Sequence, residues 1–156
     1  MYNKPYVIAE AGCNHMGQME IAHDLINTAA YFCKADAIKF PKRCPKELLT
    51  VEQYNAPHPS PANSYGDTYG AHREFLEFTV ERHAQLKAWC EEAGITYSTS
   101  VWDMTSAKEI ASLKPEFIKI PSASNNHFEM LSWLCENYGG EIQLSFGMTT
   151  HKEEEE

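Results

Sequence analysis

Short apolar runs alternate with longer stretches of helical periodicity in this chain of 156 residues, and this alternation limits its possible folds more than any other feature. The short runs have the length and the β-branched and aromatic content of strands. The predicted strands are YVIAE (6–10), AIKF (37–40), TYSTS (96–100), FIKI (117–120) and IQLS (142–145). Because strands that alternate with helices form βα units, the sequence predicts an α/β fold with about five βα steps, the last one barely begun.

Four helices are expected from apolar residues that recur at helical spacing. Their predicted apolar faces are Ile21, Leu25, Ile26, Ala29, Phe32 and Cys33; Phe75, Phe78, Leu86, Trp89 and Cys90; Ala107, Ile110 and Ala111; and Phe128, Leu131, Leu134 and Cys135. Gly94 is a typical residue to follow the end of the second helix, and Gly139 and Gly140 are expected to stop the fourth. Asp103 is a typical N-cap for the third.

The connection from residue 41 to about residue 70 is much longer than an ordinary βα loop and holds five of the eight prolines. A floppy insertion is one interpretation. Tyr54, Tyr65 and Tyr69 favour the other, an ordered arm over a site or a neighbouring subunit, because aromatic residues suit packing and recognition.

Two lysines interrupt apolar strands. Side chains alternate between the faces of a strand, so Lys39 and Lys119 are expected to point away from the helices that cover their apolar neighbours. Each is followed by a proline, Pro41 or Pro121, at which strand pairing is expected to stop. Two lysines in one cavity indicate a bound anion; the alternative is a lysine paired with a structural carboxylate.

The predicted strands also end in polar residues. These are Glu10, Thr99 and Ser100, Ser122 and Ser124, and Ser145. Ligands of parallel α/β sheets bind at the carboxyl ends of the strands. Hydroxyl and ammonium groups at that edge favour a small phosphorylated or carboxylated ligand.

Five motifs occur in the order typical of one family. They are IAEAGCNHMG (8–17), AIKFPKR (37–43), STSVWD (98–103), FIKIPSAS (117–124) and LSFGMTT (144–150). From about residue 6 onward the chain resembles the N-terminal half of the sialic acid synthase (N-acetylneuraminate synthase) family. The resemblance implies a TIM (β/α)₈-type barrel and a transferase that condenses phosphoenolpyruvate with N-acetylmannosamine or a related sugar aldehyde, releasing phosphate.

The resemblance also implies roles for individual residues. The phosphoenolpyruvate contacts would be Lys39, Thr99, Lys119, Ser122 and Ser145, and Glu10, Asn14 and His15 would lie where the carbons join. Two positions depart from the family pattern. Pro41 replaces a glutamine that often contacts the sugar, and Phe146 replaces a smaller residue, so the sugar is expected to differ or the pocket to be narrower.

The family uses a divalent metal, Mn²⁺ or Mg²⁺, whose histidine ligands lie on later strands, and it has a C-terminal antifreeze-like domain. Residues 1–156 are therefore expected to form only the N-terminal part of the barrel, with no metal ligands, and to bind better than they react. His58, His72 and His83 are expected to be surface or helix residues rather than ligands, since no HxH or HExxH pair occurs.

Two other functions stay open. One is a barrel aldolase that forms a Schiff base through Lys39 or Lys119, which requires a lysine of lowered pKa. The other is a non-catalytic half-barrel that binds or assembles through open edge strands.

The formal charge of −9, with no Lys/Arg-rich run, argues against nucleic acid and anionic membranes as partners. With neither a signal-peptide pattern nor a membrane-spanning apolar stretch, a cytoplasmic homo-oligomer is expected. Most of the five cysteines are expected to be buried. Thr150 and Glu153 form a capping-box pattern that predicts a helix start, with residues 151–156 frayed.

Overall fold

A computed structural model describes residues 4–147 and 149–155, which form a parallel sheet and its covering helices. The strands are β1 (Ile8–Glu10), β2 (Ala37–Lys42), β3 (Thr96–Val101), β4 (Phe117–Ile120) and β5 (Glu141–Leu144). The helices are α1 (Met19–Asn27), α2 (Pro45–Leu48), α3 (Val51–Asn55), α4 (Tyr69–Leu76), α5 (Val80–Ala93), α6 (Met104–Ser112), α7 (Phe128–Asn137) and α8 (His151–Glu155). A π-helical turn (Thr28–Phe32) extends α1, and 3₁₀ turns form at Pro61–Asn63 and Ser122–Ser124.

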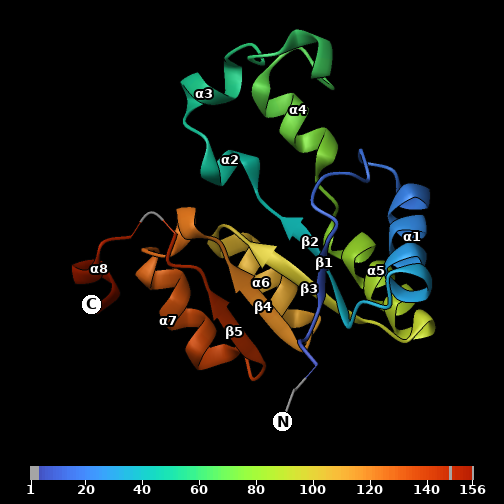
Figure 1. The fold of residues 1–156 in the computed structure, drawn as a ribbon. Helices are drawn as coiled ribbons and strands as arrows, with labels where there is room; N and C mark the ends of the chain where they lie inside the picture. Colours follow the sequence, from blue (N-terminus) through green and yellow to red (C-terminus); the bar gives the residue numbers. More distant parts are fainter. Residues whose placement is uncertain (1–3, 148, 156) are drawn as a thin grey trace.

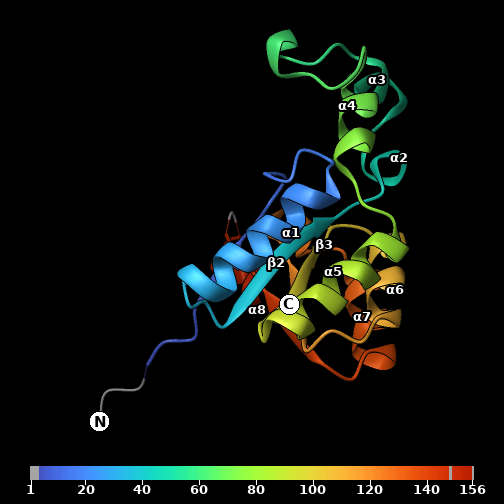
Figure 2. The same ribbon diagram turned by 90° about the vertical axis from the view of Figure 1, so that its right-hand side faces the viewer.

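The five strands are parallel and lie in the order β1-β2-β3-β4-β5. A helix returns the chain between each pair of neighbours, and Figure 2 shows α1 and α5 lying over the strands on the outer side. Strands in sequence order with helices outside are the arrangement of consecutive βα units in a TIM barrel. The predicted α/β fold and its five βα units are confirmed (Figure 1).

Apolar side chains fill the layer between the strands and the outer helices. One cluster packs β1–β3 against α1 and α5, and a second packs β3–β5 against α6 and α7. Ile38 and Phe40 belong to the first cluster, and Ile118 and Ile120 to the second. The predicted apolar faces of β2 and β4 are therefore confirmed, which leaves the lysine of each strand on the inner face.

The predicted face of the first helix is wrong at its end, where Phe32 is 85% exposed and Cys33 is also exposed. The helix changes from α to π geometry at Thr28, and the wider turn rotates the later side chains out of the core. The second helix is divided in two. Thr79 caps α5 by accepting a hydrogen bond from the Arg82 N–H, and Phe75, on α4, is half exposed.

The other helix predictions hold in part. Asp103 caps α6 by accepting the Ser106 N–H at 2.7 Å, and Gly94 follows α5 in the left-handed conformation. In α7, Leu134 is buried, but Phe128 is 55% exposed and Cys135 is exposed.

The expectation that most cysteines are buried is wrong. Only Cys90, which packs in the cluster against α1 and α5, is buried. Cys33 and Cys135 lie on the outer sides of helical segments, and Cys13 and Cys44 are half-buried in loops at the ends of β1 and β2.

Strand pairing continues through Pro41, contrary to expectation, because β2 pairs with β3 as far as Lys42. The Lys39 carbonyl accepts the Ala11 N–H, so the backbone N–H and C=O of Lys39 face β1. Pro41 lies two residues later, so its backbone groups face the same side. Since β1 ends at Glu10, the missing N–H of Pro41 costs no ladder hydrogen bond. At Pro121 the prediction is right, because β4 ends at Ile120.

The long connection forms a lobe of α2, α3 and α4 beyond the carboxyl end of β2 (Figure 1). Thr50 and Gln53 form a capping box at the start of α3. The ring of Tyr54 packs against Gly70, where a Cβ atom would lie within 2.5 Å of ring atoms. The Tyr69 N–H donates to the Ala56 carbonyl at 2.8 Å. The segment is thus an ordered arm.

The predicted capping box near the C-terminus is confirmed. The Thr150 N–H donates to Glu153 Oε2 at 2.8 Å, and the Glu153 N–H donates to Thr150 Oγ1 at 3.4 Å. Fraying of residues 151–156 stays a prediction, and Glu156 lies outside the described residues. In the described part of the chain, no helix has the length and apolar character needed to cross a membrane.

Two buried histidines make stability depend on pH. Burial lowers the pKa of His83 to about 3 and that of His15 to about 4. The unfolded chain, with histidine pKa values near 6.5, therefore binds protons that the folded chain does not, and stability falls as the pH drops below about 6.5. We expect each histidine to remove about 2 kcal/mol of unfolding free energy between pH 7 and pH 5.

Urea unfolding at both pH values would measure this loss, with His83→Gln as the comparison. The variant should lose about 2 kcal/mol less than the unaltered chain over the same pH interval, whatever its stability at pH 7. An equal loss in both proteins would contradict the assignment of a buried neutral imidazole to His83.

Candidate anion-binding site

The strand register brings both lysines to one face of the sheet. Glu10 pairs with Lys39, Lys39 with Ser98, Ser100 with Lys119, and Lys119 with Gln143. Paired residues of parallel strands point to the same side, so this polar row lies on the inner face, opposite the helices. The sequence alone placed the lysines there, and the register adds Ser98, Ser100 and Gln143.

The row is linked by polar contacts. Lys39 Nζ contacts a carboxylate oxygen of Glu10 and donates to Ser100 Oγ at 3.0 Å, and its side chain is 13% exposed. Lys119 Nζ donates to Ser145 Oγ just beyond β5. Burial lowers the pKa of Lys119, and the nearby charge of Lys39 lowers it further, against a smaller opposing effect of Glu10.

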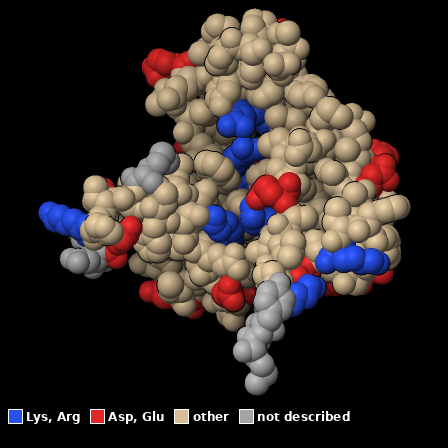
Figure 3. Space-filling model, in the orientation of Figure 1, with Lys and Arg blue, Asp and Glu red and all other residues tan. Residues whose placement is uncertain are grey.

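The two lysines differ in how their charge is balanced. Lys39 has the Glu10 carboxylate, which is what a structural ion pair would provide. Lys119 has no ion pair within the described residues; its contact there is a hydroxyl group. In Figure 3, Lys and Arg side chains gather in the hollow between the lobe and the strands, although the chain carries a net charge of −9. The hollow is therefore suited to a small anion.

Thr99 does not join this row. It pairs with Phe40 and Ile118, so its side chain faces the helices, where Oγ1 donates to Tyr97 Oη at 2.5 Å. Because the faces alternate, Ser100 occupies the position that was expected for Thr99. The sequence does not show where β3 ends before Asp103, the cap of the next helix. Counting alternate positions back from Asp103 would therefore not have decided whether Thr99 or Ser100 faces inward.

Of the two residues expected to accompany Glu10, Asn14 lies near it, since a Cβ atom at Gly12 would be 3.9 Å from Asn14 Nδ2 and 4.0 Å from Glu10 Oε1. Asn14 is exposed, and its Nδ2 donates to the Ala11 carbonyl at 2.8 Å. The His15 ring is 1% exposed and stacks on Phe78 with ring centroids 4.1 Å apart. His15 Nδ1 accepts the Gly17 N–H at 3.1 Å, so the ring holds the β1–α1 loop in place and lies in the core rather than beside Lys39.

Ser122 lies at the same edge of the sheet, in the turn after β4. It packs against Gly147, where a Cβ atom would come within 2.7 Å of Ser122 Oγ. It lines a separate hollow with Phe146 and Asn125, and Asn125 Nδ2 donates to the Ser145 carbonyl at 3.0 Å. The structure shows no hydrogen bond from Ser122 to either lysine in the described chain.

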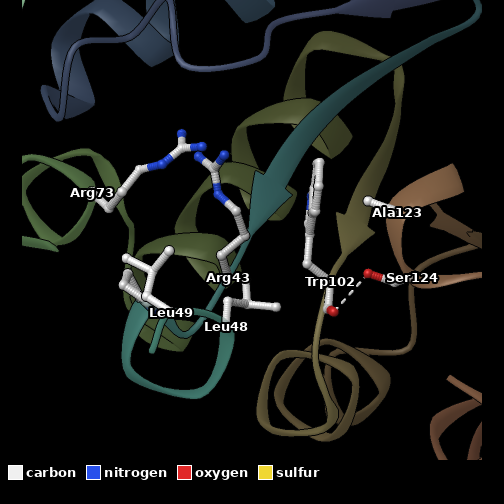
Figure 4. Close-up of a pocket in the computed structure, with 8 residues that line it drawn as sticks. Arg43, Leu48, Leu49, Arg73, Trp102, Ala123 and Ser124 are labelled. Carbon is white, nitrogen blue, oxygen red and sulfur yellow. Dashed lines mark hydrogen bonds between the residues drawn. The ribbon is translucent and has the colours of Figure 1, made fainter. Parts of the chain in front are cut away.

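A hollow of about 270 Å³ was missed by the sequence analysis. It lies between the lobe and the ends of β3 and β4 (Figure 4), and its lining is Arg43, Pro45, Leu48, Leu49, Arg73, Trp102, Ala123 and Ser124. Ser124 Oγ donates to the Trp102 carbonyl at 2.8 Å and ties the loops after β3 and β4 together. The sequence signal for Arg43 is its position four residues after Lys39. This signal is useful only if β2 is known to continue past Pro41.

The candidate metal ligands among residues 4–147 and 149–155 are the His, Cys, Asp and Glu side chains. No group of three or more of these described side chains lies close enough together to hold a metal ion. The resemblance implied a divalent metal whose histidine ligands lie on later strands, so the metal stays an expectation that these residues do not test.

Comparison with known proteins gives consistent matches. A family model described as the NeuB family matches residues 25–156. N-acetylneuraminate-9-phosphate synthase of Mus musculus is 32% identical over 143 residues, which cover 92% of this chain and 39% of the mouse protein. N,N'-diacetyllegionaminic acid synthase of Campylobacter jejuni is 28% identical over 153 residues, covering 98% of this chain and 45% of that protein.

A solved structure of the same kind of enzyme is also similar to this chain. The N-acetylneuraminic acid (sialic acid) synthetase of Leptospira borgpetersenii, in complex with citrate, has a TM-score of 0.79 and 25% identity, covering 98% of this chain and 48% of that chain. The chain thus spans less than half the length of the relatives it matches.

Proposed function

Because the chain belongs to the NeuB family, we propose that it supplies the phosphoenolpyruvate-binding part of an enzyme that condenses phosphoenolpyruvate with N-acetylmannosamine or a related amino sugar. The product would be a nonulosonate of the sialic or legionaminic acid type. The enol carbon of phosphoenolpyruvate bonds to the sugar aldehyde carbon, water adds at C2, and inorganic phosphate leaves.

The observation that carries the proposal is Lys119, a half-buried lysine on the inner face whose described neighbours provide no carboxylate. Phosphoenolpyruvate has two anionic groups, and the inner face offers two ammonium groups, on Lys39 and Lys119. Their Ser100 and Ser145 partners add hydroxyl donors. Charge-assisted hydrogen bonds of this kind fix the orientation of the ligand, which is a positioning role.

Glu10 is the one acidic side chain in the row, and it contacts Lys39. Its carboxylate would set the position of the Lys39 ammonium group and would limit how many anionic groups the site accepts. The expected roles of Thr99, Ser122, Asn14 and His15 stay predictions, and the geometry supports Ser100 more directly than Thr99.

Calorimetric titration of the chain with phosphoenolpyruvate tests the proposal. Binding should be saturable, and inorganic phosphate or pyruvate alone should bind more weakly because each offers a single anionic group. A folded chain that binds none of the three at millimolar concentration would contradict the proposal.

A Schiff-base aldolase is the second candidate, and the lowered pKa of Lys119 favours it, since a neutral amine is the nucleophile that this chemistry needs. Borohydride reduction in the presence of pyruvate distinguishes the two functions. An aldolase would give a covalent adduct on Lys119 that is visible by mass spectrometry, whereas a phosphoenolpyruvate-binding site would give none.

Self-association is a further expectation, because β1 and β5 are the outer strands of the described sheet and each pairs on one side only. Unpaired strand edges bind other strands. Sedimentation velocity of the 156-residue chain should show larger species that increase with concentration. A monodisperse monomer at all concentrations would contradict both the expected homo-oligomer and the half-barrel alternative. The cytoplasmic location stays a prediction.

A further inference from the structure

The two hydroxyl partners of the lysine row differ in how firmly the sheet holds them. Ser100, the partner of Lys39, lies inside β3 and pairs with residues of the strands on both sides. Ser145, the partner of Lys119, comes one residue after the end of β5, which is an outer strand of the described sheet. The strand ladder therefore fixes the position of Ser100, whereas Ser145 depends on contacts outside the strands.

Asn125, in the turn after β4, supplies such a contact. Its side-chain Nδ2 donates to the Ser145 carbonyl at 3.0 Å, and the Ser145 N–H donates to the Ile120 carbonyl at 3.1 Å. The two hydrogen bonds hold the peptide groups on both sides of Ser145. They therefore fix the backbone from which Ser145 Oγ reaches Lys119 Nζ.

The turn that carries Asn125 is itself anchored on two sides. The preceding residue, Ser124, is buried, and its Oγ donates to the Trp102 carbonyl at 2.8 Å, just beyond β3 (Figure 4). Toward β5, Gly147 lies so close that a Cβ atom there would be 2.7 Å from Ser122 Oγ. Asn125 thus extends from a fixed support, which is what positioning of a second group requires.

Lys119 needs such positioning more than Lys39 does. A lysine ammonium group is a point charge on a flexible stem. The Glu10 carboxylate contacts that of Lys39, whereas the contact of Lys119 in the described chain is the Ser145 hydroxyl. A hydrogen bond from the ammonium group also favours the charged form of the lysine. Displacement of Ser145 would therefore loosen the ammonium group and lower the pKa of Lys119 beyond the lowering that burial already causes.

We infer that Asn125 is a positioning residue for the Lys119 ammonium group and acts through Ser145; its part in ligand binding rests on the proposed function. The Asn125 side chain contacts the Ser145 carbonyl, so its effect on an anion at the lysine row is indirect. Loss of this side chain should weaken anion binding no more than loss of the Ser145 hydroxyl does. Once that hydroxyl is gone, loss of the Asn125 side chain should have no further effect.

A double-variant cycle of Asn125→Ala and Ser145→Ala, read by calorimetric titration with phosphoenolpyruvate, tests the inference. Each single variant should weaken binding about threefold to tenfold, as expected for loss of one hydrogen bond. The double variant should bind as weakly as Ser145→Ala alone. Asn137→Ala is the matched control and should leave the affinity unchanged. Asn137 Nδ2 also donates to a backbone carbonyl, that of Trp133 at 2.9 Å, but on exposed α7.

The pKa of Lys119, followed by NMR titration of the same proteins without ligand, is a second measurement that a merely structural role of Asn125 would not affect. Asn125→Ala should lower this pKa, because the ammonium group loses its positioned acceptor. The double variant should have the same Lys119 pKa as Ser145→Ala. Asn137→Ala should have the pKa of the unaltered chain.

An unchanged Lys119 pKa in Asn125→Ala would overturn the inference. Additive losses of affinity in the double variant would also overturn it, since they would show that Asn125 does not act through Ser145. Binding of phosphoenolpyruvate with equal affinity in all variants would refute the positioning role and leave the proposed function standing. The expected pKa changes in a chain that does not bind phosphoenolpyruvate would support the positioning role and refute the function. Circular dichroism of each variant confirms that it is folded.

Discussion

Replacing Lys119 with methionine is expected to weaken phosphoenolpyruvate binding about 30-fold or more, equivalent to about 2 kcal/mol or more. The ammonium group of Lys119 is half-buried, and in the described structure it has a serine hydroxyl but no carboxylate as its partner. An anionic ligand would therefore supply the opposite charge, and removal of the lysine removes that attraction. Methionine keeps the apolar length of the side chain, and Ile118 and Ile120 pack on the opposite face of β4, so the core contacts of the strand are retained.

Two variants make this result specific. Lys39→Met should also weaken binding, because it removes a cation and leaves the Glu10 carboxylate to repel the ligand. Lys108→Met, on the outer face of α6 over the Trp133 ring, changes the net charge by the same amount and should have little effect. Unchanged calorimetric affinity in both inner-face variants would show that the anion binds elsewhere.

Replacing Arg43 with methionine is expected to lower the free energy of unfolding by about 3–5 kcal/mol at pH 7. Arg43 and Glu77 are each 9% exposed in their side chains and form an ion pair, with a second hydrogen bond from the Arg43 N–H to Glu77 at 3.0 Å. Burial raises the pKa of Glu77, against the attraction of Arg43. Without the guanidinium group, the carboxylate is left buried and unpaired.

Urea unfolding checks this prediction. In Arg43→Met the Glu77 pKa rises further, so the folded protein binds a proton that the unfolded chain does not, and the difference in unfolding free energy from the unaltered chain should be smaller at pH 5 than at pH 7. The double variant Arg43→Met/Glu77→Leu should be more stable than Arg43→Met, since no buried charge remains. Lys46→Met, which breaks the exposed pair with Glu74, should cost about 1 kcal/mol or less. A loss that small in Arg43→Met would contradict the importance of the buried pair.

The order of strands and helices could be predicted because it depends on local periodicity, which the sequence carries directly. Faces of strands were predictable where a lysine stands among isoleucines, as at Lys119. They were not predictable at Thr99 and Ser100, because residues 98–100 are all polar and a shift of one position decides which side chain points inward. The burial of His15 was not predictable either, because the loop that carries it folds back onto Phe78, a residue 63 positions later.

The arginine hollow depends on contacts that no local pattern describes. Arg43 and Arg73 are 30 positions apart, and they meet only because α4 folds back over the end of β2. The continuation of β2 through Pro41 depends in turn on β1 ending at Glu10. Both the hollow and the continuation of β2 depend on where another segment ends or folds back. The pattern of one segment alone therefore does not predict them.

The lobe of α2, α3 and α4 is a single excursion of the chain between β2 and α5, whereas the lysine row is built from the strands themselves. Substitutions, insertions or deletions in the excursion can accumulate without disturbing the register that holds Lys39 and Lys119. Natural variation there can therefore reshape the hollow at the far end of the face while the lysine row at the near end is kept. One contiguous stretch of codons is enough to remodel the hollow's lobe side.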